Sequence, residues 1–222
     1  PDTVPTFGVQ GNLTADAARQ LRLKTGIPVA YRAGDQPNNT LSLNVLNPGE
    51  VATTAGTSGV IYGIIDKNVY DNYSRVNPFA HVNYTPEQPN VGVLLCINGT
   101  GILYSWIKQH LLDNKYSYNE LNALAAKAPI GSKGLMCYPF GNGAERVLNN
   151  RDVQAHFSGI NFNIHTKGDV VRAAQEGIVF SFKYGLEIMK NMGMKFDVIR
   201  AGHSNLFQSK VFREAFVNTC NV

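Results

Sequence analysis

A glycine-rich turn between two β-branched, apolar runs restricts the first half of this 222-residue chain to sheet structure more than any other feature does. The runs are 51–55 and 60–65, and the turn at 56–59 is Gly-Thr-Ser-Gly. β-branched side chains favour strands, and a short glycine-containing turn joins antiparallel neighbours, so the pattern predicts a β-hairpin. Further strands are expected at 79–83 and 91–97, and short strands in succession indicate an antiparallel meander.

The other elements are predicted from helix caps and apolar spacing. Before the hairpin we expect a helix over 14–24, which Thr14 opens and a left-handed Gly26 ends. A strand over 28–32, a turn over 34–37 and a short helix over 38–45 should follow it. After it we expect helices over 101–112, 117–128, 169–192 and about 209–217, and short strands over 135–138 and 198–201, the latter buried. Strands covered by helices predict an α/β or α+β class, and no linker separates two domains convincingly.

Composition excludes several classes of protein. Hydrophobic residues at 44% and charged residues at 16% exclude intrinsic disorder, and no apolar run approaches the ~20 residues of a membrane span. The net charge of +4 is spread along the chain, so nucleic-acid binding has little support. The cysteines are far apart and the histidines lack ligand spacing, so we predict no metal site, no disulfide framework and a cytoplasmic location. The start at Pro1 without methionine indicates a chain that is processed or cut from something longer.

Two polar segments of the first half could carry chemistry. Asp35 follows a predicted strand, where a carboxylate can point into a ligand crevice and accept a hydroxyl proton. Aspartate after glycine is also ordinary turn chemistry, and that interpretation is favoured for Asp35 taken alone. The 56–59 turn either offers backbone N–H groups and two hydroxyls to phosphate oxygens or is only a tight hairpin turn, and both interpretations stay open.

Two segments of the second half leave similar alternatives. The segment 202–205, Gly-His-Ser-Asn, lies between a predicted strand and a predicted helix, where nucleotides often bind. Taken alone, it is more simply a helix start capped by Ser204 or Asn205. Glu145 and Arg146 lie in a glycine-rich loop, as a structural ion pair or as part of a loop that closes over a ligand.

Six segments, in order along the chain, together resemble the FGGY family of carbohydrate kinases, and within it the xylulokinase-like branch. Asp35 and Gln36 are similar to the family's GD[NQ] segment, and the 56–59 turn is similar to its GTSG phosphate loop. The others are Asn98 to Gly101 followed by Trp106, the P…GER loop from Pro139 to Arg146, the signature from Phe157 to Gly177, and Ala201 to Asn205 where the adenosine-binding glycines lie.

Three positions depart from the family's pattern. Gln36 stands where many xylulokinases have Asn, which bears on the choice of substrate. The 201–205 segment has no run of glycines, which bears on the nucleotide contacts. Gln175 stands where the signature has an apolar residue, and we expect this to touch only helix packing.

The resemblance implies an α/β fold of the actin-like, ribonuclease-H-like ATPase class, with a mixed sheet and flanking helices. Residues 1–40 would be the end of the N-terminal sugar kinase domain and the interdomain segment. Residues 41–222 would be the C-terminal nucleotide-binding domain, truncated at its C-terminus. Sugar and ATP would meet in the cleft between the two domains, so the chain alone is expected to lack much of the activity.

The resemblance also implies an ATP-dependent sugar kinase that uses Mg²⁺ and phosphorylates a ketopentose, D-xylulose first, with ribulose, fuculose or glycerol as alternatives. Asp35 would be the general base and Gln36 would touch the sugar. The expected ATP contacts are Gly56, Thr57, Ser58, Gly101, Ser105, Gly202 and Asn205. A homodimer would fit the family. Two other classes stay open, namely a catalytically silent nucleotide-binding module and a non-ATP α/β hydrolase or binding domain.

Overall fold

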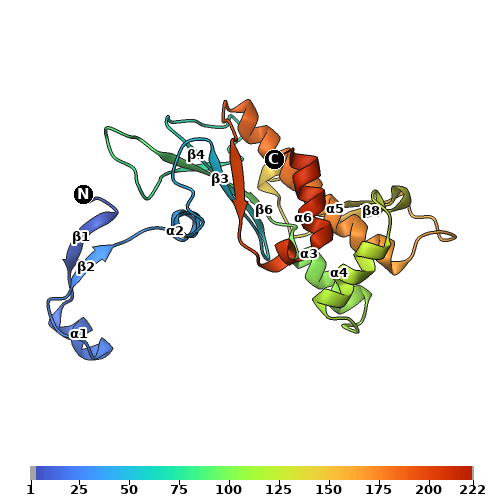
Figure 1. Ribbon diagram of the computed structural model, residues 1–222, viewed down its shortest axis with the longest axis horizontal. Coiled ribbons are helices and arrows are strands. Elements are labelled where there is room, and N and C mark those ends of the chain that lie inside the picture. Colours follow the sequence, from blue (N-terminus) through green and yellow to red (C-terminus); the bar gives the residue numbers. More distant parts are fainter. Residues whose placement is uncertain (1–3, 222) are drawn as a thin grey trace.

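The computed structural model describes residues 4–221, and its centre is a five-stranded mixed sheet (Figure 1). The strands lie in the order β5 (Asn77–Ala80), β6 (Val91–Ile97), β4 (Gly59–Ile65), β3 (Glu50–Ala55) and β9 (Val198–Ala201). Neighbouring strands are antiparallel except β3 and β9, which are parallel. The predicted hairpin is confirmed as β3 and β4, with Ala55 opposite Gly59 at the turn.

Two predictions about the strands are wrong. The meander fails because β6, and not β5, pairs with β4, so that β5 lies at the edge of the sheet. Pro78 in β5 has no N–H to donate, which suits an edge strand, whereas β6 is largely buried and pairs on both sides. The expectation that 198–201 is buried fails because β9 forms the other edge, where Val198 is 36% exposed.

Both faces of the sheet are covered, which explains the composition of its central strand. Ile61 of β4 belongs to the large core on one face, whereas Tyr62 and Ile64 pack on the other face against Val45. Alternate side chains of a strand point to opposite faces, so a strand covered on both sides carries apolar residues throughout. All seven residues of β4 are accordingly buried.

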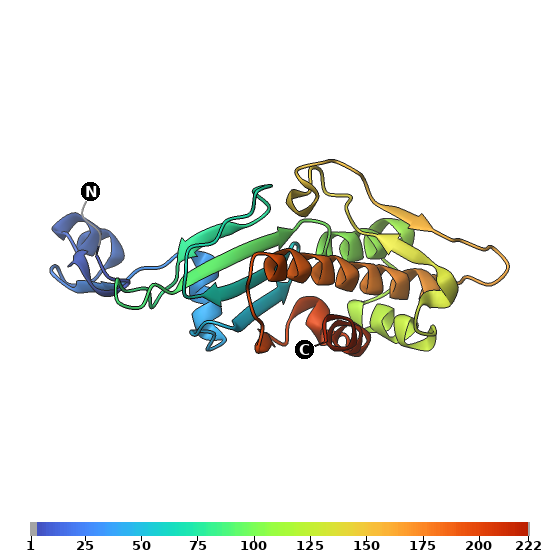
Figure 2. The ribbon, with the colours of Figure 1, turned by 90° about the horizontal axis from the view of Figure 1, so that it is seen from above.

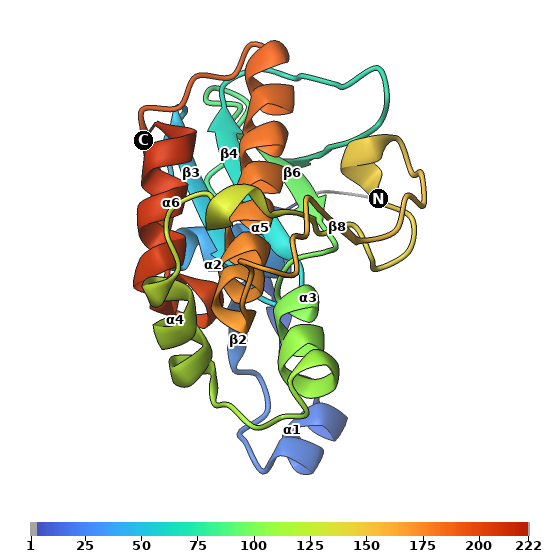
Figure 3. The ribbon, with the colours of Figure 1, turned by 90° about the vertical axis from the view of Figure 1, so that its right-hand side faces the viewer.

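A layer of helices covers the first face. α5 (Lys167–Asn191) lies along the sheet in Figure 2. In Figure 3, α3 (Gly101–Trp106) and α6 (Lys210–Cys220) flank α5, and α4 (Tyr118–Lys127) also packs against it. None of the helices within residues 4–221 has the length and apolar character needed to cross a membrane.

The helix predictions hold with local differences at the ends. Ser117 and Glu120 form the predicted capping box at the start of α4. The helix predicted over 101–112 is present as α3 followed by a π-helical turn over Ile107–Leu111. α5 begins two residues before the predicted start because Thr166 and Asp169 form a capping box there. A separate two-stranded ribbon pairs β7 (Met136–Tyr138) with β8 (His156–Ser158), and β8 was not predicted.

The N-terminal segment extends away from the sheet (Figure 1). β1 (Phe7–Asn12), which was not predicted, pairs antiparallel with β2 (Pro28–Tyr31), and α1 (Ala15–Leu21) lies between them in the chain. Thr14 caps α1 as predicted, but the left-handed residue at its end is Arg22 (φ 57°) and not Gly26.

α2 (Asp35–Ser42) occupies residues that were predicted to form a turn. Gly34 takes the N-cap position, and Pro37 lies in the first helical turn, where a missing N–H costs no helical hydrogen bond. The helix therefore begins at Asp35 instead of Asn38. The chain that leaves α2 brings Val45 onto the second face of the sheet.

One carboxylate anchors β9 beside β3. Glu50 Oε2 accepts the N–H groups of Leu46 at 2.7 Å and Asn47 at 3.0 Å, and Oε1 lies 3.1 Å from Nη1 of Arg200 on β9. Burial would raise the pKa of Glu50, but the two backbone hydrogen bonds and Arg200 outweigh it and lower the pKa to about 2.

We expect acid to remove the stabilisation that Glu50 provides. Because folding lowers its pKa, the contribution is complete above the ordinary pKa of 4.5 and is lost as the pH falls from there toward about 2. A Glu50→Gln variant should be less stable than the parent by about 1–3 kcal/mol at neutral pH, and the difference should shrink in acid. Urea unfolding followed by circular dichroism over this pH range measures the difference. A difference that does not change with pH would contradict the assignment.

Candidate functional site

A cavity of about 380 Å³ opens at one end of the sheet. Its walls come from the β3–β4 turn, α3, α4 and the segment that follows β9. β3, β6 and β9 all run in the same direction, because β3 and β6 are each antiparallel to β4 and β9 is parallel to β3. The segments that follow these three strands therefore meet at one edge, where ligands commonly bind in α/β proteins.

Most of the predicted ATP contacts come together at this cavity. Five of the seven predicted contacts line it, namely Gly56, Thr57, Gly101, Ser105 and Asn205. Ser58 and Gly202 lie outside the lining, although each belongs to a segment that contributes to it. Three segments that are far apart in the sequence thus form one site.

Two backbone hydrogen bonds join the β3–β4 turn to α3. The N–H groups of Gly101 and Ile102 donate to the carbonyls of Gly56 at 2.9 Å and Thr57 at 3.1 Å. A Cβ on Gly101 would lie 2.3 Å from the Gly56 oxygen, so only glycine allows this approach. The carbonyl groups of Gly56 and Thr57 are thus used in hydrogen bonds to the helix. Within residues 4–221 the N–H groups of Thr57 and Ser58 have no protein acceptor, which leaves both donors for ligand oxygens.

Gly56 is open on the side where a side chain would stand. A Cβ there would meet only ordinary contacts, the nearest being Asn205 Nδ2 at 3.6 Å. Packing therefore does not demand glycine at this position, in contrast to Gly101. The absence of a side chain instead keeps space between the turn and Asn205.

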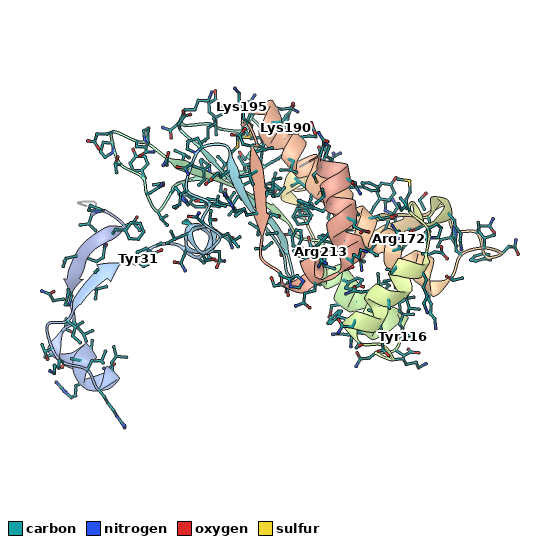
Figure 4. The ribbon with its side chains drawn as sticks, in the orientation of Figure 1. Tyr31, Tyr116, Arg172, Lys190, Lys195 and Arg213 are labelled. Atoms are coloured by element: carbon teal, nitrogen blue, oxygen red, sulfur yellow. The ribbon has the colours of Figure 1, made fainter. Side chains whose placement is uncertain are left out.

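An arginine of α6 and two buried side chains, Leu206 and Phe207, hold the segment after β9. Asn205 has a left-handed backbone (φ 49°) and begins a 3₁₀ turn that ends at Gln208. Arg213 of α6, labelled in Figure 4, donates from Nη1 to the carbonyls of Phe207 at 2.6 Å and Gln208 at 3.1 Å. The second half of the turn is thereby tied to the start of α6.

Asp35 and Gln36 lie outside the cavity, at the start of α2. Asp35 is exposed, and its Oδ1 accepts the N–H of Gln36 at 2.7 Å. Burial raises the pKa of Cys96 on β6, and the carboxylates of Glu145 and Asp35 act in the same direction. Cys96 is paired with Val60 next to the turn and packs on the second face. Asp35 therefore lies near the same end of the sheet as the cavity, on the face that the α2 segment covers.

Glu145 does not form the ion pair with Arg146 that was one of its two predicted roles, because the ion pairs in the described part of the chain join other residues. Its side chain is buried, and Oε2 accepts the backbone N–H of Asn98 at 2.9 Å. Asn98 Nδ2 donates in return to the carbonyl of Ala144 at 3.0 Å. Burial raises the pKa of Glu145, although backbone hydrogen bonds oppose the shift. Glu145 thus fixes the residues between β6 and α3, and closure of its loop over a ligand stays a prediction.

Sequence reasoning missed about half of the cavity wall. The additional lining residues are Ala55, Ile102, Tyr104, Tyr118, Asn122, Leu206 and Gln208. Tyr118 and Asn122 are four residues apart in α4 and so share a helix face, and this spacing was the signal that could have found them. The ring of Tyr118 stacks on Tyr104 with centroids 5.8 Å apart.

The mixed sheet, its flanking helices and a cavity at the carboxyl ends of three strands define an α/β module with the actin-like ATPase fold. The chain belongs to the FGGY family of carbohydrate kinases, because residues 51–222 match the C-terminal domain of that family. Both the predicted fold and the predicted family are therefore confirmed.

Three relatives illustrate this membership. The chain is 29% identical over 199 residues to a xylulose kinase of Staphylococcus epidermidis, which covers 90% of this chain and 39% of that protein. It is 29% identical over 187 residues to a gluconokinase of Bacillus subtilis, over 80% of this chain and 35% of that protein. The crystal structure of a xylulose kinase from Rhodospirillum rubrum superposes with a TM-score of 0.85 at 26% identity, over 99% of this chain and 43% of that chain. The chain thus spans roughly two fifths of the length of these relatives.

The contrast between the two glycines predicts opposite effects on stability. Gly101→Ala should lower the free energy of unfolding by about 1–3 kcal/mol, because its Cβ overlaps the backbone of Gly56 and α3 must move. Gly56→Ala is the matched control, and its stability should stay within about 0.5 kcal/mol of the parent because its Cβ has room. Urea midpoints measure both. Equal stability of the two variants would show that the tether to α3 is not needed.

Proposed function

We propose that the chain supplies the nucleotide-binding part of an ATP-dependent sugar kinase, which transfers the γ-phosphate of ATP to a hydroxyl of a ketopentose, D-xylulose in the first instance. The observation that carries the proposal is the convergence of five predicted ATP contacts on one cavity. Its volume lies within the ~300–1,000 Å³ that is usual for small-molecule sites. Membership of the family and the xylulose kinases among the relatives support the class of reaction.

The β3–β4 turn is suited to the phosphates. Phosphoryl transfer depends mainly on positioning the phosphates and neutralising their charge. The N–H groups of Thr57 and Ser58 would donate to phosphate oxygens, and Gly56 would let the backbone approach them. Within residues 4–221 no three His, Cys, Asp or Glu side chains gather into a metal site. Mg²⁺ is often held largely by substrate phosphates and would supply charge neutralisation there when bound.

Asp35 is proposed as the general base. Its carboxylate is exposed and accepts the N–H of Gln36 through Oδ1, so Oδ2 is open to a sugar hydroxyl. Removal of that proton as the oxygen attacks the γ-phosphate is the positioned base catalysis that contributes ~10²–10⁴-fold. Gln36 would contact the sugar beside it. The position of both residues outside the cavity agrees with a sugar that approaches the γ-phosphate from the opposite side.

The domain assignment is part of the same proposal. Residues 1–40 would end the sugar-binding domain, and residues 41–222 would form the nucleotide-binding domain. The N-terminal segment with β1, α1 and β2 extends away from the sheet, and the family match begins at residue 51, which supports this division. We propose that the whole protein is a cytoplasmic enzyme and that it forms a homodimer.

The identity of the sugar acceptor is tested with a panel of substrates. The relatives carry the names xylulose kinase and gluconokinase, and a glycerol kinase of Plasmodium falciparum shares the fold. The test is a coupled ADP-release assay of the full-length protein with ATP·Mg²⁺ and a panel of D-xylulose, L-ribulose, L-fuculose, gluconate and glycerol. Preference for one acceptor would support the kinase and identify its substrate. ATP binding without turnover on any of them would favour the alternative of a catalytically silent nucleotide-binding module.

We expect Asp35→Asn in the full-length protein to lower kcat by ~10²–10⁴-fold, because the proton acceptor is lost. The KM for ATP should change by less than about threefold, since Asp35 lies outside the cavity. Asp66→Asn, at an exposed site just past β4, is the matched control and should leave both constants unchanged. Undiminished kcat in Asp35→Asn would remove it as the base.

Gly56→Ala should affect ATP and leave the fold intact. The added methyl group stands between the turn and Asn205, so we expect the KM for ATP to rise about tenfold. The KM for the sugar should change little. Steady-state kinetics with ATP and sugar varied in turn separates the two constants, and an unchanged KM for ATP would place the phosphates elsewhere.

A further inference from the structure

A buried hydrogen-bond network lies behind the cavity wall at the end away from the β3–β4 turn. Its centre is Gln175 of α5, which is 0% exposed. Gln175 Nε2 donates to the Tyr104 hydroxyl at 2.8 Å and to Asn122 Oδ1 at 3.0 Å, and Oε1 accepts from the Ser209 hydroxyl at 2.8 Å. The Tyr104 hydroxyl donates in turn to Asn122 Oδ1 at 2.7 Å. Four elements, α3 to α6, are joined through these side chains.

The hydrogen bond from the Ser209 hydroxyl sets the direction of the other bonds in this network. Ser209 caps α6, where its Oγ accepts the N–H of Phe212 at 3.3 Å, and its hydroxyl donates to Gln175 Oε1 at 2.8 Å. The amino group of Gln175 must then face Tyr104 and Asn122. The Asn122 atom on that side must therefore be the oxygen, because two donors cannot pair. Reversal of the chain would take from the buried Ser209 hydroxyl the acceptor that it has in Gln175 Oε1, which is costly.

The result is a hydrogen-bond donor of fixed direction in the cavity wall. Asn122 lines the cavity, and its oxygen is occupied by Gln175 and Tyr104. Its Nδ2 makes no hydrogen bond to protein within residues 4–221. Burial raises the pKa of Tyr104, so the phenol keeps its proton and continues to donate to Asn122. The cavity thus receives an amino group from Asn122 and not a carbonyl.

This donor lies where a nucleobase would follow the phosphates. α3 runs from Gly101, at the turn, to Ser105 about 6 Å further along its axis, and both residues line the cavity. Tyr118 lines the far part, is 45% exposed, and is backed by Tyr104. An aromatic face of this kind stacks on a base. The ring of Tyr118 can stack on a base, and the amino group of Asn122 beside it can donate a hydrogen bond to that base. Together they are suited to recognise a nucleobase.

We propose that Asn122 donates a hydrogen bond to an acceptor atom on the edge of the bound nucleobase and that Gln175 is the positioning residue that fixes this donor. The proposal rests on the proposed function, because it assigns the base end of the same cavity. Ring nitrogens of adenine and the carbonyl oxygen of guanine are acceptors, whereas the amino group of adenine is a donor. The nucleotide is therefore held with an acceptor edge toward α4.

The test compares a ligand that has a base with one that has none. Binding of ADP and of inorganic tripolyphosphate to the full-length protein is measured by isothermal titration calorimetry. Asn122→Ala should weaken ADP binding about tenfold, because one hydrogen bond to the base is lost, and should leave tripolyphosphate binding unchanged. Asn119→Ala, on the exposed side of α4, is the matched control and should change neither.

Gln175→Leu tests the positioning role. Leucine is about as large as glutamine, but it makes no hydrogen bond to Asn122. The amide of Asn122 can therefore rotate. ADP binding should fall about threefold with tripolyphosphate unchanged, and Asn122→Ala added to Gln175→Leu should cost less than it does alone. A merely structural role would weaken both ligands equally.

The outcomes separate this inference from the proposed function. If the parent protein binds ADP and the Asn122→Ala variant binds it equally well, the role of Asn122 is overturned. The nucleotide site itself then stays in place. Equal losses of ADP and tripolyphosphate in both variants would also overturn it, because the cavity and not the base contact would have changed. Parent protein that binds neither ligand would contradict the proposed function itself.

Discussion

The site depends on two backbone hydrogen bonds that α3 donates to the β3–β4 turn. They orient the turn, because the carbonyls of Gly56 and Thr57 face the helix and the N–H groups of Thr57 and Ser58 are left for a ligand. An anion needs donors and is repelled by carbonyl oxygens, so this orientation decides what the turn can bind. It is possible only because Gly101 has no side chain. α3 then leads from the turn to the far end of the cavity.

The parallel pairing of β9 with β3 places the third wall of the cavity. β9 is a short edge strand, so apolar burial holds it weakly. Glu50 compensates, since it ties the loop before β3 to Arg200 of β9 through one carboxylate. The chain leaves β9 at the same end as the turn, and Arg213 holds the 3₁₀ turn that follows. The place of Asn205 therefore rests on these polar contacts together with Leu206 and Phe207, which follow it and are buried in the core.

Two buried polar side chains, Gln175 and Glu145, differ in how fully their atoms are hydrogen-bonded. Both amide atoms of Gln175 are paired, so its burial costs little and its partners are fixed in direction. The expectation that this residue touches only helix packing is too narrow, because it bonds to two residues of the cavity wall. Glu145 is different, since its Oε1 is buried without a partner in the described chain, and its pKa is raised accordingly.

The amino-acid sequence by itself determined the elements whose signals are local. The hairpin around residues 56–59 and the capping box of Ser117 and Glu120 appear as predicted, because strand preference, turn composition and caps involve residues close in the chain. The ordered motifs also identified the family. Only the tertiary structure decided that β6 lies beside β4, that Asn122 reaches the cavity and that Asp35 lies outside it. Strand order and convergence arise from packing between distant segments, which no local pattern encodes.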